Sequence, residues 1–159
     1  MTRRGLLLLL TPLTGCGFAP RGATSFAFER LALVGFAPRS PMQAALERQL
    51  ARMPVRITEV AQAQVVLELQ RERAIKTSVA STAAGQVREW QLLLELEYRL
   101  STGAGELLLP STSLRLTRDL SSTESQALGK EQEEAGLRRA MEQEAVNLLM
   151  RRLAAVKPR

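Results

Sequence analysis

The stretch QVREWQLLLELEYRL, residues 86–100, carries the clearest periodic pattern in the chain. Apolar side chains recur at every second position, so one face of an extended strand would collect Trp90, Leu92, Leu94, Leu96, Tyr98 and Leu100. The positions between them are polar or charged, apart from Leu93. A one-sided alternation of this length predicts a long antiparallel strand with one buried face and one solvated face.

Glycine-containing turns stand on both sides of this strand. The sequences TAAG at 82–85 and TGAG at 102–105 each predict a reversal of the chain direction. The segments beyond these turns, 65–81 and 107–119, also contain alternating apolar residues. We therefore expect three long strands in an antiparallel meander.

The segment before the meander predicts a strand followed by a helix. Residues 30–36 are apolar on both faces, which is typical of an inner strand. Ser40 and Pro41 suit an N-cap and a first helical position, and an apolar stripe continues at helical spacing to about Arg52. Residues 55–58 are then expected to form a short extended piece.

The chain closes with a predicted helix from about residue 124 to residue 153. The apolar stripe of this helix consists of Leu137, Met141, Ala145, Leu148 and Leu149. Gly129 and Gly136 weaken its first half, where a loop or a kink is expected. The expected fold is an α+β two-layer sandwich, with two helices packed on one face of a mixed, mostly antiparallel four-stranded sheet. The first helix can serve as a crossover that makes its flanking strands parallel.

The N-terminus has the arrangement of a secretory signal. Arg3 and Arg4 precede an apolar run at 6–10, and LTGC at 13–16 supplies small residues at a cleavage point. The LTGC stretch resembles the lipobox of bacterial lipoproteins, in which the cysteine is acylated and becomes the first mature residue. Cys16 is the single cysteine of the chain, which excludes an internal disulfide and leaves a lipid anchor or an idle thiol.

These features divide the chain into four expected segments: a lipoprotein signal peptide at 1–15, a lipidated tether at 16–27, a single domain at 28–156 and a loose tail at 157–159. Cleavage removes two arginines, so the 22 basic residues fall to 20 against 16 acidic residues, a net charge of +4. A basic surface on an exported protein favours a phosphate-bearing lipid over nucleic acid as its partner. The alternative is an ordinary solvated surface with a small excess of basic residues.

The composition argues against catalysis. The chain has no histidine, which is the commonest general base and the commonest metal ligand, and its one cysteine is assigned to the lipid. We find no glycine-rich phosphate loop and no nucleophile elbow. Aromatic residues are 4% of the chain, too few for a single-stranded nucleic-acid platform. The sequence therefore predicts a protein that is not an enzyme and that holds no metal or cofactor.

Charged residues gather on one arm of the first long hairpin. Arg71, Glu72, Arg73 and Lys76 all lie in the predicted strand at 65–81. Charges on an edge strand commonly protect it from pairing with other chains. The functional alternative is a basic strand face that contacts a phosphorylated lipid or the wall of a partner.

Short motifs spread over the mature chain resemble one known family. They are CGF at 16–18 with RG at 21–22, GQ at 85–86 ahead of EWQ at 89–91, Arg118 ahead of ALGKE at 127–131, and RRL at 151–153. In this order and spacing they resemble the lipopolysaccharide-assembly lipoproteins of the LptE family. The resemblance implies the fold expected above and a role without catalysis.

The resemblance also implies a location and partners. Members of that family sit as a plug inside the outer-membrane barrel LptD, support its folding and contact lipopolysaccharide on its way to the cell surface. Gly17 rather than aspartate after Cys16 implies sorting to the outer membrane, with the domain facing the periplasm and inserted in the barrel lumen. The alternative is an auxiliary lipoprotein of another envelope lipid-transport system.

For lipopolysaccharide contact, the resemblance points to Lys130, which occupies the position of a family lysine. A second basic position of the family falls on Ala83 in this chain, and Lys76 or Arg88 could place a charge nearby. The alternative for Lys130 is a solvated lysine near the start of a helix. A positive charge at this end of a helix is unfavourable, which favours a reason for it outside the helix.

Overall fold

The alternating stretch forms β4 (Val87–Ser101), the middle strand of a long meander. Its neighbours are β3 (Val65–Ser81) and β5 (Leu107–Ser121), and both pairings are antiparallel, as expected. The computed structural model describes residues 25–158 except 82, 84, 86 and 122–126. The side chains of residues 87, 88, 127 and 128 also lie outside this description.

The sheet has five strands rather than the four expected, in the order β2-β1-β3-β4-β5. The additional strand is β2 (Arg56–Ile57), which pairs in parallel with β1 (Arg30–Val34). Strand β1 is also parallel to β3, so the sheet is mixed as expected: two short pairings are parallel and two long pairings are antiparallel. Strand β2 lies within the extended piece expected at 55–58, but a two-residue pairing leaves no periodic pattern to show that this piece joins the sheet.

The first helix, α1 (Pro41–Leu50), begins where the sequence predicts. The Ser40 hydroxyl accepts a hydrogen bond from the Gln43 backbone N–H at 3.2 Å, and Pro41 occupies the first turn. This helix connects the parallel strands β1 and β2 and precedes β3. The expected crossover is therefore confirmed.

The second helix, α2 (Ala127–Ala155), runs unbroken through Gly129 and Gly136. The expected loop or kink was wrong, because each glycine costs only about 1 kcal/mol in a helix whose second half docks into the core. Neither helix in the described part of the chain is long and apolar enough to cross a membrane.

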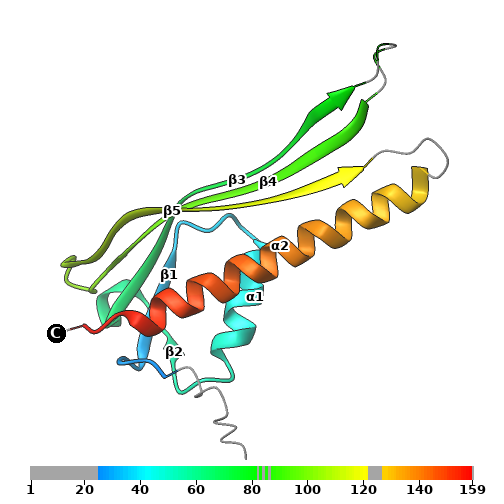
Figure 1. The fold of residues 1–159 in the computed structure, drawn as a ribbon. Helices are drawn as coiled ribbons and strands as arrows, with labels where there is room; N and C mark the ends of the chain where they lie inside the picture. Colours follow the sequence, from blue (N-terminus) through cyan, green and yellow to red (C-terminus); the bar gives the residue numbers. More distant parts are fainter. Residues whose placement is uncertain (1–24, 82, 84, 86, 122–126, 159) are drawn as a thin grey trace, which may run out of the picture.

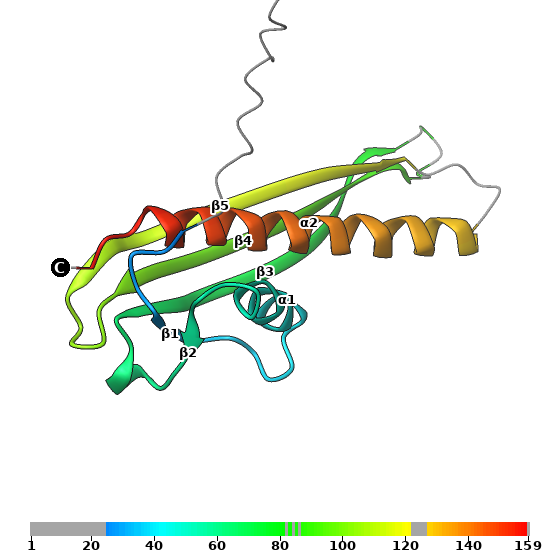
Figure 2. The ribbon, with the colours of Figure 1, turned by 90° about the horizontal axis from the view of Figure 1, so that it is seen from below.

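Both helices cover the same face of the sheet, which we call the inner face (Figures 1 and 2). The core lies mainly where α1 and the second half of α2 meet the sheet, and fully buried side chains there include Leu31, Leu46, Leu67, Leu96, Leu100, Leu149 and Leu153. Figure 2 shows the long strands extending past α1, and we call this extended part the distal half of the sheet. There the first half of α2 is the covering helix, and none of its residues from 129 to 140 is fully buried.

An extra residue in β3 changes which of its side chains reach the inner face. Leu69 lies opposite Tyr98, but the next pair is Arg71 with Glu97, so Gln70 forms a β-bulge. Uninterrupted alternation from Leu69 would turn Arg71 inward. The bulge instead directs alternate residues from Glu72 onward to the helices, as their pairing with the inward leucines of β4 shows.

Candidate functional site

A small cavity of about 80 Å³ lies between the distal half of the sheet and the first turns of α2. We call it the distal cavity, and its lining residues are Lys76, Trp90, Leu120, Ser121, Lys130, Glu131 and Glu134. Residues of the strands β3, β4 and β5 and of helix α2 all line the distal cavity. Two cations, two carboxylates and one indole ring therefore converge on the cavity.

Lys76 reaches the cavity because the Gln70 bulge places it on the inner face of β3, opposite Leu92. Its Nζ donates to Glu134 Oε2 at 2.6 Å and lies 4.7 Å from the centre of the Trp90 ring. A lysine at this distance from an indole face gains a cation–π attraction. The strand, the ring and the helix together fix the position of this positive charge.

Lys130 enters the cavity from α2. Its Nζ donates to the backbone carbonyl of Ser121 at the end of β5 and lies 3.1 Å from Glu133 Oε2. The bond to Ser121 ties the first turns of α2 to the sheet, while the contact with Glu133 lies within the helix. The side chain of Lys130 remains 28% exposed, so it is available to a ligand from solvent.

Glu134 lies between two positive groups. Its Oε2 accepts from Lys76, while Oε1 accepts from Arg138 Nε at 2.9 Å and Arg138 Nη2 at 2.8 Å. The hydrogen bond from Lys76, followed by that from Arg138, lowers the pKa of Glu134 below its usual value. The carboxylate is therefore ionised and engaged through both oxygens at neutral pH.

The structure brings together two of the predicted contact residues, Lys76 and Lys130. Arg88 lies in β4 with its side chain outside the described part, Ala83 is exposed in the preceding turn, and Cys16 lies outside the described residues. In the part of the chain that the structure describes, no three acidic, histidine or cysteine side chains gather to hold a metal ion.

The sequence does not predict that Glu134, Arg138 and Trp90 take part in this site. Glu134 and Arg138 are a helical i,i+4 pair, a pattern so common on exposed helices that it gives little signal. Trp90 was expected only as a member of the buried face. The one available signal was that Trp90 is the single tryptophan of the chain and lies near the start of its strand.

The opposite face of the sheet, which we call the outer face, carries cross-strand ion pairs. Arg99 lies 2.7 Å from Glu68, Arg71 lies 3.7 Å from Glu97, and Arg115 lies 2.8 Å from Glu95. The bond from Arg115 is the main cause of a lowered pKa for Glu95. Charges of both signs thus alternate across three strands.

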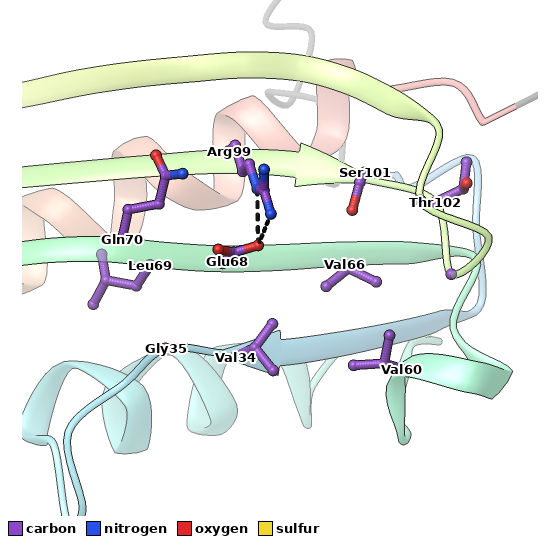
Figure 3. Close-up of a pocket in the computed structure, with 12 residues that line it drawn as sticks. Val34, Gly35, Val60, Val66, Glu68, Leu69, Gln70, Arg99, Ser101 and Thr102 are labelled. Carbon is purple, nitrogen blue, oxygen red and sulfur yellow. Dashed lines mark hydrogen bonds and ion pairs between the residues drawn. The ribbon is translucent and has the colours of Figure 1, made fainter.

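A shallow groove of about 770 Å³ lies on the outer face, at the end of the sheet opposite the distal half (Figure 3). The Glu68–Arg99 pair crosses its floor between β3 and β4, and Val34, Val60 and Val66 give it an apolar side. The groove lies on the face of the sheet away from α1 and α2, so it is separate from the distal cavity.

The bulge at Gln70 places Glu72 on the inner face of β3, opposite Leu96. Partial burial, with the nearby Glu142 carboxylate second, raises the pKa of Glu72. A raised folded-state pKa favours the folded protein below the unfolded pKa of glutamate, and this contribution is lost as the pH rises through the folded value. Glu72→Gln should therefore increase the free energy of unfolding at pH 7, by at most about 0.3 kcal/mol because solvent screens this largely exposed carboxylate, and the gain should disappear below pH ~4.

Urea denaturation at both pH values measures this difference. Glu68→Gln is the matched control, since Glu68 lies on the same strand but is paired with Arg99, and its loss should not stabilise the protein. A Glu72→Gln variant that is less stable than the wild type at pH 7 would contradict the prediction.

Comparison with protein families matches residues 28–153 to the model described as LptE, lipopolysaccharide-assembly. Two similar proteins are LPS-assembly lipoproteins LptE. The one from Pectobacterium atrosepticum is 29% identical over 156 residues, which cover 96% of this chain and 83% of that protein. The one from Photorhabdus laumondii is 30% identical over 155 residues, with the same coverage of 96% and 83%.

Solved structures agree with the fold. The solution NMR structure of uncharacterized lipoprotein B from Nitrosomonas europaea has a TM-score of 0.75 and 26% identity, covering 88% of this chain and 92% of that chain. The crystal structure of a minor lipoprotein from Acinetobacter baumannii has a TM-score of 0.68 and 16% identity, covering 82% and 94%. The second likeness bears on the fold alone.

Proposed function

The chain belongs to the LptE family of lipopolysaccharide-assembly lipoproteins, and from this membership we propose that it is the plug and assembly subunit of an LptD barrel. The observation that carries the proposal is the family match over residues 28–153, most of the chain. Its family is not a known family of enzymes, in line with the absence of histidine from the chain. The proposed role is structural.

The outer face of the sheet supports this role. The lumen of a large outer-membrane barrel is polar, and a surface that enters it must be polar too. The outer face meets this requirement with charges that are already paired within the domain, such as Arg115 with Glu95 and Arg99 with Glu68. These pairs can therefore approach a lumen wall without being buried as isolated charges.

The anchor supplies the location. Acylation of Cys16 after removal of residues 1–15 would hold the protein in the membrane by two or more acyl chains, and two such signals give stable anchoring. The tether at 16–27 would then connect the outer membrane to the domain at 28–156, leaving 157–159 as a tail. The domain would face the periplasm, with its distal half inside the barrel.

The distal cavity is the proposed contact for lipopolysaccharide. Lys76 and Lys130 both line it, and a phosphate of lipid A could accept charge-assisted hydrogen bonds from their Nζ groups. Arg88 is a third candidate on the same strand as Trp90. The partly exposed Trp90 side chain would give the apolar part of the lipid a surface beside these charges.

Purification of the full-length protein through a C-terminal affinity tag, from outer membranes in mild detergent, tests the proposal. We expect one barrel-forming outer-membrane protein in stoichiometric amount, together with lipopolysaccharide. An unrelated tagged outer-membrane lipoprotein in the same detergent is the control. A protein that elutes as a monomer without a barrel would contradict the proposal, and a soluble or inner-membrane partner in its place would favour an auxiliary role in another lipid-transport system.

A further inference from the structure

Glu134 holds the position that an external anion would need in order to bind at the distal cavity. Lys76 donates to one of its carboxylate oxygens at 2.6 Å, and Arg138 donates twice to the other at 2.8 and 2.9 Å. These two cations come from different elements, β3 and α2, so they converge on the carboxylate from two sides. Two or more donors converging on one small anion is the usual geometry of a phosphate site.

The two lysines do not depend on Glu134 alone for their positions. Lys76 Nζ lies 4.7 Å from the centre of the Trp90 ring, and this attraction remains if the carboxylate moves away. Lys130 lines the same cavity and is tied to the Ser121 carbonyl of β5. Both lysines are thus held at the sheet, while Arg138 approaches Glu134 from the next turn of α2, outside the lining of the distal cavity.

The carboxylate itself is free to leave. Glu134 has a long flexible side chain on a helix turn that lacks fully buried residues, and its side chain is 21% exposed. Rotation about its side-chain bonds can move the carboxylate into solvent while the helix stays in place. The free-energy cost of this exchange is small, since ion pairs at partly exposed positions contribute about 1 kcal/mol or less to stability.

We propose that Glu134 is a resident competitor in a phosphate site formed by Lys76 and Arg138, and that a phosphomonoester binds there by displacing it. This inference rests on the proposed function, which places lipopolysaccharide phosphates at the same cavity. A singly charged anion has the same charge as the Glu134 carboxylate, so displacing that carboxylate gives it no electrostatic advantage. A phosphomonoester has nearly two negative charges and three acceptor oxygens, and a second phosphate can engage Lys130. Glu134 therefore makes the site selective for a phosphomonoester over a singly charged anion, and a second phosphate on the same ligand adds the contact with Lys130.

Binding to the purified full-length protein in detergent tests this selectivity. The probes are inorganic pyrophosphate for free phosphate, micellar lipopolysaccharide for the lipid source, and acetate for a singly charged anion. In Glu134→Gln, we expect the affinity for pyrophosphate and lipopolysaccharide to rise about 3- to 10-fold, as loss of about 1 kcal/mol of competition predicts. Acetate binding, too weak to detect in the wild type, should become measurable in the variant.

Two further variants separate this mechanism from a general charge effect. Glu144→Gln removes the same charge from α2, but Glu144 pairs with Arg118 and does not line the distal cavity, so its affinities should match the wild type. In Lys76→Gln/Glu134→Gln the gain should be lost, because one of the two cations is gone.

An unchanged or weakened affinity for both phosphorylated probes in Glu134→Gln would overturn the inference and leave Glu134 as a structural ion pair. The proposed function can fail independently of it. If lipopolysaccharide binds neither protein while pyrophosphate still binds Glu134→Gln more tightly, the inference that Glu134 is a competitor holds and the proposed contact with lipopolysaccharide is contradicted. If lipopolysaccharide binds the wild type and Glu134→Gln equally, the lipid role stands and the competitor is lost.

Discussion

Replacement of Gly35 by alanine should lower the free energy of unfolding by about 3 kcal/mol, through backbone strain and a steric clash together. Gly35 follows the last residue of β1 and has a φ angle of +82°. A Cβ at this position would lie 2.0 Å from the Leu69 backbone carbonyl oxygen in β3. Because the obstacle is strand backbone rather than a flexible side chain, β1 and β3 would have to separate.

Gly105→Ala is the matched control for this variant. Gly105 also has a positive φ, +89°, but a Cβ there would meet nothing within 4 Å. It should therefore cost only the conformational penalty of about 1 kcal/mol. Urea denaturation of both variants measures the difference, and equal losses would show that the close approach to Leu69 does not matter.

Leu96→Ala should remove about 3 kcal/mol of unfolding free energy, within the usual range for a fully buried leucine. Leu96 is 0% exposed and lies in the middle of β4, between Glu72 of β3 and Leu114 of β5 on the inner face. Truncation would leave a cavity beneath the helices that two antiparallel neighbours prevent from collapsing. The loss should appear as a lower denaturation midpoint with an unchanged slope.

Leu93 offers a control on the same strand. It lies on the outer face opposite Ile75 and Thr117 and is only partly buried, so Leu93→Ala should cost less than about 1 kcal/mol. The strand propensity changes equally in the two variants, and the difference between them isolates burial. A Leu93→Ala variant as unstable as Leu96→Ala would mean that the outer face is also packed.

The pattern of β4 could be predicted from the sequence because a single physical requirement governs it. From Trp90 to Leu100 the inward positions face the helices or the core, and the outward positions other than Leu93 are polar and meet solvent or a neighbouring polar side chain. The start of α1 was equally accessible, since Ser40 and Pro41 act locally. These features depend on residues close together in the chain.

Other features depend on contacts between distant segments. Strand β2 exists because Arg56 N–H donates to the Glu29 carbonyl at 2.7 Å and Thr58 N–H donates to the Leu31 carbonyl at 2.9 Å. Backbone contacts of this kind leave no trace in side-chain periodicity. The unbroken course of α2 likewise follows from packing of its second half rather than from the propensity of its glycines.

The candidate site was predicted in part. Lys130 and Lys76 were selected, but their meeting in one cavity could not be predicted, because the face that Lys76 occupies depends on the bulge at Gln70. The role of Glu134 was also inaccessible, since the sequence does not show which helix residue lies above Lys76. Pairing between elements decided both points.

The bulges in β3 and β5 also divide the sheet into the distal half and the part that packs on the core. An extra residue occurs in β3 at Gln70, and another occurs in β5 between Leu109 and Thr112, at the level where β4 carries Tyr98. Beyond this level, adding or removing two residues in each long strand keeps every remaining side chain on its own face. The distal half can therefore change its reach in steps of about 7 Å, two residues of strand rise, while the proximal core keeps its residues unchanged.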